Sequence, residues 1–81
     1  MNLYVSNLDF GIQDDALKNM FATFGTVTSA KVILDRTTGK SRGFGFVEMP
    51  DKNEATKAIS SLNGSMSEGK QIKVSEARPK N

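Results

Sequence analysis

The residues that could do chemistry in this sequence are aromatic and cationic side chains that alternate with glycine over residues 42–49, Arg-Gly-Phe-Gly-Phe-Val-Glu-Met. Alternate side chains of an extended strand point to the same side, so Arg42, Phe44 and Phe46 would share one face. Tyr4 lies in a second apolar run near the start of the chain. Aromatic rings stack on planar bases and cations attract phosphates, so this combination suits single-stranded nucleic acid.

The same sequence offers few residues suited to catalysis. The 81 residues include no Cys and no His, which excludes disulfides, a Cys or His nucleophile or base, and a zinc site of the usual Cys/His kind. The nine acidic residues are scattered, and neighbours such as Asp14 and Asp15 do not converge on one point. We predict that the protein is not an enzyme and has no metal site, no cofactor and no small-molecule substrate.

The length lies below the ~100–150 residues of a typical domain and therefore indicates one domain. Hydrophobic residues make up 37% and charged residues 25% of the chain, and no apolar run approaches the ~20 residues of a membrane-spanning helix. No charged and then apolar leader precedes the first apolar run. We therefore expect a cytoplasmic domain over residues 1–78, a short polar tail over residues 79–81, and no membrane partner.

Charge is distributed unevenly, although the formal net charge is only +2. Residues 26–47 and 70–81 carry an excess of Lys and Arg, whereas residues 9–24 and 48–69 carry an excess of Asp and Glu. This alternation suggests a molecule with one basic side.

Two segments have the apolar spacing i, i+3, i+4, i+7 of one helical face. The first begins at Asp14–Asp15, whose charges suit the positive end of a helix, and Gly25 is expected to end it. The second begins at Asp51, with Glu54 three residues later as in a capping box. The apolar positions are Leu17, Met20, Phe21 and Phe24 in the first helix and Ala55, Ala58, Ile59 and Leu62 in the second.

Four segments have the composition of strands: residues 3–6, 27–34, 42–49 and 71–75. A polar loop over residues 35–41 joins the second and third, and a loop through Gly69 precedes the fourth. The order βαββαβ predicts an α+β fold, a ferredoxin-like sandwich with a four-stranded antiparallel sheet and two helices on one face.

Strand alternation assigns the side chains to the two faces of this sheet. The face under the helices is expected to hold Leu3, Val5, Ala30, Val32, Leu34, Val47, Met49, Ile72 and Val74. The open face is expected to hold Tyr4, Ser6, Lys31, Ile33, Arg42, Phe44, Phe46, Glu48, Lys73 and Ser75. Phe10, between the first strand and the first helix, is interpreted as core or core rim.

Two alternatives to an open aromatic face exist. In the first, the phase of the third strand is shifted by one residue, which would bury Arg42 and Glu48. Charged side chains are rarely buried without partners. A dimer partner could instead cover the rings. We expect a monomer with an exposed apolar patch that marks a binding site.

The motif at residues 42–49 resembles the octamer of the RNA recognition motif family, with which seven of eight positions agree. Residues 3–8, Leu-Tyr-Val-Ser-Asn-Leu, resemble the companion hexamer of that family on the first strand. Met49 departs from the aromatic residue that the family prefers, and Gln13 stands where many members have a capping Ser or Thr. The resemblance spans nearly the whole chain. The start at Met1 and the ending over residues 76–80 are similar to those of small single-domain bacterial members, and plant glycine-rich members look alike in this region.

The resemblance implies roles for individual residues. Tyr4 and Phe44 match the aromatic residues that stack on successive bases, Phe46 matches the ring that packs against sugars, and Arg42 matches the basic residue that pairs with phosphate. Further contacts are implied for side chains on the outer strands, the segment that follows the last strand, and the loop between the second and third strands. These are Lys31, Lys73, Ser75, Arg78, Arg36 and Lys40.

The resulting hypothesis is a single-stranded RNA-binding module in bacterial post-transcriptional regulation, which would bind single-stranded DNA more weakly. A protein-interaction module that uses the helical side is the alternative. A small ferredoxin-like enzyme such as an acyl-phosphate hydrolase is a third hypothesis, but the chain lacks the phosphate-gripping loop that it needs.

Overall fold

A computed structural model describes residues 1–77 of the chain. The elements follow in the order β1 (Asn2–Ser6), α1 (Asp14–Ala22), β2 (Ser29–Leu34), β3 (Ser41–Glu48), α2 (Lys52–Leu62), β4 (Met66–Ser67), β5 (Lys70–Gln71) and β6 (Lys73–Ala77). The predicted ferredoxin-like order is confirmed. The loop predicted through Gly69 contains a small antiparallel hairpin, β4–β5, that the sequence did not indicate.

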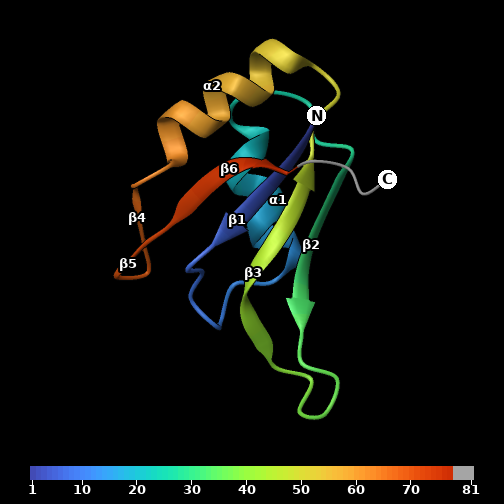
Figure 1. Ribbon diagram of the computed structural model, residues 1–81, viewed down its shortest axis with the longest axis vertical. Coiled ribbons are helices and arrows are strands. Elements are labelled where there is room, and N and C mark those ends of the chain that lie inside the picture. Colours follow the sequence, from blue (N-terminus) through green and yellow to red (C-terminus); the bar gives the residue numbers. More distant parts are fainter. Residues whose placement is uncertain (78–81) are drawn as a thin grey trace.

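The main sheet has the strand order β2-β3-β1-β6, and every neighbouring pair is antiparallel. Figure 1 views this sheet with α1 behind β1 and β3. Side chains from both helices and from the buried phase of the strands form one apolar core. The predicted arrangement of four antiparallel strands with helices on one face is therefore confirmed.

Helix α1 packs through the predicted apolar stripe, with Leu17 and Phe21 fully buried. The side chain of its N-cap residue, Gln13, makes no capping hydrogen bond in the described part of the chain. Gly25 does not end the helix in the expected way, because α1 stops at Ala22 and Gly25 is not among the described residues with positive φ. A Cβ atom at Gly25 would instead collide with the side chain of Glu54, so glycine is needed there for space.

Helix α2 forms only half of the predicted capping box. The Asp51 Oδ1 atom accepts a hydrogen bond of 3.0 Å from the backbone N–H of Glu54. The Glu54 carboxylate accepts a hydrogen bond from the backbone N–H of Thr26, also at 3.0 Å, rather than from the N-cap residue. Glu54 therefore ties α2 to the segment between α1 and β2. Ala55 and Ala58 bury the inner face of the helix.

The predicted alternation of the strands is confirmed in β3, where Gly43, Gly45 and Val47 are buried and Arg42, Phe46 and Glu48 are exposed, with Phe44 half-buried. The phase shifted by one residue is thereby contradicted.

Leu34 is a correction to the predicted core. Its side chain is 55% exposed, because it lines an open groove with Ile12 and Asp14 instead of lying beneath a helix. The register of β2 and β3 also shifts between Val32 and Leu34.

Gly45 allows α1 to approach the sheet. A Cβ atom at this position would lie 2.6 Å from the carbonyl oxygen of Lys31 and 3.0 Å from a methyl carbon of Leu17. Both distances are shorter than ordinary van der Waals contact, so this close approach requires glycine.

Asp14 joins the start of α1 to β2. Its Oδ1 atom accepts a hydrogen bond of 2.7 Å from the backbone N–H of Val32. Within residues 1–77, neither helix has the length and apolarity needed to cross a membrane.

Candidate nucleic-acid interface

Three aromatic rings form a cluster on the sheet face that the helices leave open. Tyr4 lies 5.8 Å from Phe44 and 5.4 Å from Phe46 between ring centroids. Phe44 and Phe46 are 6.4 Å apart and nearly perpendicular. We call Tyr4, Phe44 and Phe46 the aromatic trio. Strand alternation alone predicts its face, and pairing of β1 with β3 brings Tyr4 opposite Phe46.

The rings support one another while leaving surface accessible. Tyr4 and Phe44 are half-buried, and Phe46 is 41% exposed. Tilted and edge-on aromatic pairs at such distances stabilise each other. Planar ring surface that is held in place in this way can stack with flat ligand groups.

Cations and a hydroxyl flank the trio along the sheet. Lys31 pairs with Phe46 across β2 and β3, and Ser75 pairs with Tyr4 across β6 and β1. In the next row, Ser6 lies between Phe44 and Lys73. Lys31, Lys73 and Ser75 are all exposed, so the sheet brings these three predicted residues together with the trio.

Arg42 lies at the end of the same face. Its guanidinium carbon is 5.9 Å from the centroid of the Phe44 ring, within the range of a cation–π contact. Arg42 is exposed, so its charge remains available to a ligand that reaches Phe44.

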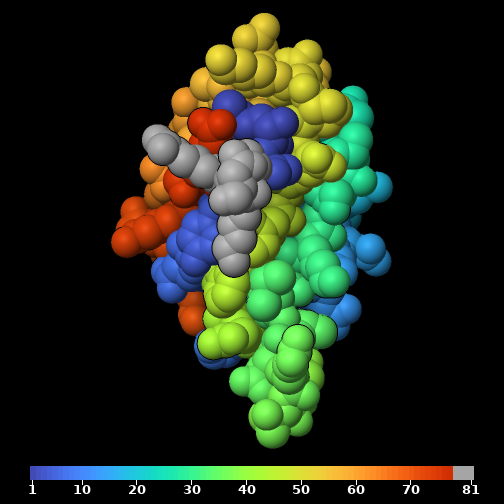
Figure 2. Space-filling model, turned by 45° about the vertical axis from the view of Figure 1, so that its right-hand side comes forward, coloured from blue at the N-terminus to red at the C-terminus, as the bar shows by residue number. Residues whose placement is uncertain are grey.

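The loop that joins β2 to β3 carries Arg36 and Lys40 away from the trio. It extends beyond the sheet at the bottom of Figure 1, and it stands out in light green in Figure 2. The Asp35 carboxylate organises this loop by accepting hydrogen bonds from the backbone N–H groups of Thr37 and Thr38, at 2.8 and 3.1 Å.

These hydrogen bonds affect the acidity of Asp35. The N–H of Thr38 has the largest effect, followed by that of Thr37, and together with the charge of Arg42 they lower the pKa of Asp35 below its ordinary value. The ionised carboxylate is therefore the form that stabilises the loop.

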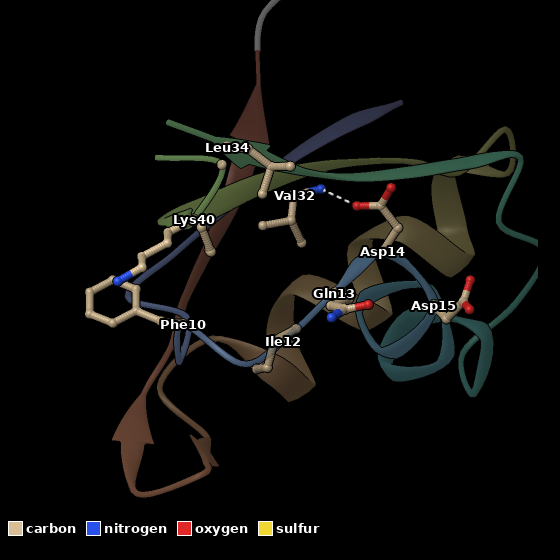
Figure 3. A pocket seen from close by; sticks show the side chains of 10 residues that line it. Phe10, Ile12, Gln13, Asp14, Asp15, Val32, Leu34 and Lys40 are labelled. Atoms are coloured by element: carbon tan, nitrogen blue, oxygen red, sulfur yellow. Dashed lines mark hydrogen bonds between the residues drawn. The ribbon is translucent and has the colours of Figure 1, made fainter. Parts of the chain in front are cut away.

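The predicted residues at the periphery lie in different places. Lys40 lines a groove of about 920 Å³ that also contains Leu34, Ile12 and Asp14 and runs between α1 and the β2–β3 loop (Figure 3). Arg36 is exposed in that loop. Arg78 lies outside the described residues.

Phe10 lies beside the candidate site, which the sequence does not predict. Its hydrophobicity indicates core or core rim, but its side chain is 64% exposed. Together with Tyr4, Phe44, Arg42 and Lys70 it lines a second groove, of about 320 Å³, that begins at the aromatic trio. A loop has no periodic pattern from which the direction of a side chain could be predicted.

A sheet with two helices on one face and exposed aromatic rings on the other is the architecture that the resemblance of the sequence motifs implies. The family model for the RNA recognition motif matches residues 3–73. The chain belongs to the RNA recognition motif family.

Similar proteins come from plants and from bacteria. The chain is 53% identical over 75 residues to a chloroplastic 29 kDa ribonucleoprotein of Arabidopsis thaliana, covering 93% of this chain and 22% of that protein. It is 41% identical over 80 residues to RbpB of Nostoc sp., a protein whose name describes RNA binding, covering 99% and 78%. The chain thus spans less than half the length of several plant relatives that it matches.

A solved structure has nearly the same fold. The crystal structure of RNA Binding Protein PG1 superimposes with a TM-score of 0.93 at 48% sequence identity, covering 99% of each chain.

Proposed function

We propose that this chain binds single-stranded RNA on the open face of the sheet. In this proposal Tyr4 and Phe44 stack on successive bases, and Phe46 packs against the sugar between them. The observation that carries the proposal is the exposed aromatic trio held within a frame of cations. Stacking of a base on an aromatic side chain stabilises a complex by ~1–3 kcal/mol, and every base has a face that can stack.

The surrounding polar residues would hold the RNA backbone. Arg42, Lys31 and Lys73 would attract phosphates, and the Ser75 hydroxyl would donate or accept a hydrogen bond at the edge of the sheet. Arg36, Lys40 and Arg78 are proposed to contact RNA that extends past the trio. Single-stranded DNA, whose bases and phosphates offer the same stacking and charge contacts, is proposed as a weaker ligand.

The proposal also covers the oligomeric state, location and biological role of the domain. We propose a non-catalytic, monomeric domain over residues 1–78, followed by a polar tail over residues 79–81, that acts in the cytoplasm of a bacterium in post-transcriptional regulation. The similarity to the Nostoc protein supports a bacterial member of the family. The absence of Cys and His supports binding rather than catalysis.

Replacing Phe44 by Ala tests the proposal directly. The loss of one stacked base should weaken binding of a random-sequence RNA 8-mer pool about 5- to 150-fold, measured by fluorescence anisotropy at fixed low salt. Asn53→Ala is the control, since it truncates an exposed side chain on α2, outside the open face of the sheet, and should leave the affinity unchanged.

The location of the RNA is measured separately by backbone-amide NMR. Titration with the same pool should shift the amides of residues 3–6, 42–48 and 73–77. Unchanged affinity in a Phe44→Ala, Phe46→Ala double variant with native amide dispersion would contradict the proposal. Shifts confined to the helices would assign RNA to another surface and would also contradict it.

A further inference from the structure

Phe10 projects into solvent from a loop that the structure holds firmly. The residues on either side of it in the loop are anchors, because Leu8 is fully buried and Ile12 nearly so. The backbone N–H of Leu8 donates a 2.8 Å hydrogen bond to the carbonyl oxygen of Gly43. The backbone N–H of Ile12 donates a 3.0 Å hydrogen bond to the carbonyl oxygen of Asp9. The exposed ring is therefore presented at a defined position.

That position is at the end of β3. A Cβ atom built on Gly43 would lie 3.4 Å from a ring carbon of Phe10, and Gly43 belongs to the buried phase of the strand, opposite to that of Phe44. The Phe10 ring therefore lies at the end of the sheet, and the second groove connects it to the open face, where Arg42 also lines that groove. Its groove includes Tyr4 and Phe44 as well, so the two aromatic surfaces are continuous.

A second contact brings a cation to the ring. Asn7 has a left-handed backbone with φ of 60°, and its side-chain N–H group donates a 2.6 Å hydrogen bond to the carbonyl oxygen of Gln71. This bond joins the loop to the β4–β5 hairpin. The Lys70 ammonium of that hairpin lies 4.4 Å from the centroid of the Phe10 ring.

The lining of this groove has the charge that a phosphate chain requires. Within residues 1–77, the charged side chains that line it are Arg42 and Lys70, and both are cations. An aromatic ring, two cations and continuity with the trio favour the same strand of RNA as the occupant over a peptide.

We propose that Phe10 and Lys70 form an additional nucleotide site, in which a base of the RNA strand stacks on Phe10 and the Lys70 ammonium pairs with an adjacent phosphate. This inference rests on the proposed function, because the strand reaches Phe10 from the trio. The base and the Lys70 ammonium compete for the same ring face. A cation–π contact at an exposed site changes an equilibrium constant by about 2- to 5-fold, whereas a stacked base changes it by about 5- to 150-fold. The base therefore displaces the ammonium from the ring.

Phe10 variants separate stacking from packing in the loop. Phe10→Leu keeps an apolar side chain beside Gly43 but removes the ring, and it should weaken binding of the random RNA 8-mer pool about 5- to 30-fold. Phe10→Tyr keeps the ring and should bind within about 2-fold of the wild type. Circular dichroism and thermal unfolding of each variant verify the fold.

The result distinguishes this site from the proposed function itself. If the wild type binds and Phe44→Ala weakens binding, but Phe10→Leu binds like the wild type, the additional site is overturned and the trio stands. If the wild-type protein does not bind the RNA pool, the proposed function fails, and this inference fails with it. An equal loss in Phe10→Tyr and Phe10→Leu would also overturn stacking at this position.

Two further measurements report on the site without relying on affinity alone. The chain contains no Trp, so Phe10→Trp introduces a single indole. When it is excited at wavelengths that Tyr4 does not absorb, its emission should be quenched as RNA saturates the protein. Lys70→Gln should reduce the salt slope of binding by about 0.7, the value for one phosphate contact on a single strand, whereas Lys57→Gln on α2 should not. Unchanged emission or an unchanged Lys70→Gln slope would overturn the proposal and leave the groove to another partner such as a peptide.

Discussion

Gly45 shows how a single residue positions the whole site. Its missing side chain lets Leu17 of α1 and the backbone of β2 approach β3 closely. The same strand carries Phe44 and Phe46 on its opposite face. A residue without a side chain on the inner face thus allows α1 and β2 to pack closely against the strand that carries the outer rings.

We predict that Gly45→Ala destabilises the domain by ~1–3 kcal/mol, because the new methyl group would meet the Lys31 carbonyl and the Val32 backbone, which cannot rotate away. Urea unfolding followed by circular dichroism measures the change. Gly11→Ala is the control, since its new methyl group would meet only the end of the Asp9 side chain. Equal stability of Gly45→Ala and the wild type would contradict the packing argument.

At this scale, the sequence predicts residues in strands better than residues in loops. The alternation of β3 assigned Phe44 and Phe46 to the open face, since charged Arg42 and Glu48 share their phase. Phe10 lies in a loop, where no neighbouring charged residues fix a phase. The direction of its side chain depends on tertiary contacts of the loop with Gly43. Hydrophobicity alone therefore predicts a core or core-rim position for Phe10, and the exposed side chain contradicts this prediction.

The helices show how an element can be stabilised at its ends. Asp51 caps α2 with its side chain, whereas Gln13 precedes α1 in an extended conformation without such a bond in the described residues. We predict that Gln13→Ser stabilises the domain by ~0.5–1 kcal/mol and that Asp51→Ala destabilises it by ~1 kcal/mol. Thermal unfolding measures both, and a destabilised Gln13→Ser would contradict the assignment of the cap.

The β2–β3 loop should depend on pH through Asp35. Since hydrogen bonds from Thr38 and Thr37 lower the pKa of this carboxyl in the folded protein, its stabilising effect is fully present above the unfolded pKa of ~3.9 and is lost as pH falls through the lower folded value. The amide chemical shifts of Thr37 and Thr38 should titrate with a midpoint below ~3.9.

Asp35→Asn serves as the control for this titration, because the variant has no carboxyl at that position and should lose the transition. A wild-type midpoint at or above the ordinary aspartate value would contradict the assigned hydrogen bonds.

Element boundaries were predictable to within a few residues, but the contacts between elements were not. The apolar spacing correctly identified both helices. The expected roles of Gly25 and Glu54 were incomplete, because the two residues pack against each other across the fold. Leu34 has the right phase for burial, yet the helices do not cover it. Such outcomes depend on three-dimensional distance, which local patterns do not contain.

At the scale of the whole molecule, charge should distinguish the two faces. We predict that Lys31→Gln or Lys73→Gln reduces the slope of log affinity for RNA against log salt concentration by ~0.7, the value for one lost phosphate contact. Lys18→Gln on α1 is the matched control, since its exposed charge lies on a helix. Anisotropy titrations at several salt concentrations measure the slopes, and an equal effect of all three variants would indicate non-specific attraction.

The overall fold was the most predictable feature, because each local pattern favoured the same arrangement. Two helical stripes and four alternating strands leave one sheet face uncovered, and two family motifs fell on adjacent strands. The β4–β5 hairpin escaped prediction because its two-residue strands are too short to show alternation. That hairpin supplies Lys70, so the least predictable element also borders the site.

The hydrogen bond from the Val32 N–H to Asp14 affects how the edge of the sheet meets strands of other molecules. β2 lies at the edge of the sheet, where unpaired backbone groups offer a template for strands of other molecules. The Asp14 carboxylate occupies the Val32 N–H and places a negative charge beside it. An incoming strand would have to break this bond and lie against a carboxylate, so the first turn of α1 opposes the addition of a foreign strand to β2 at Val32.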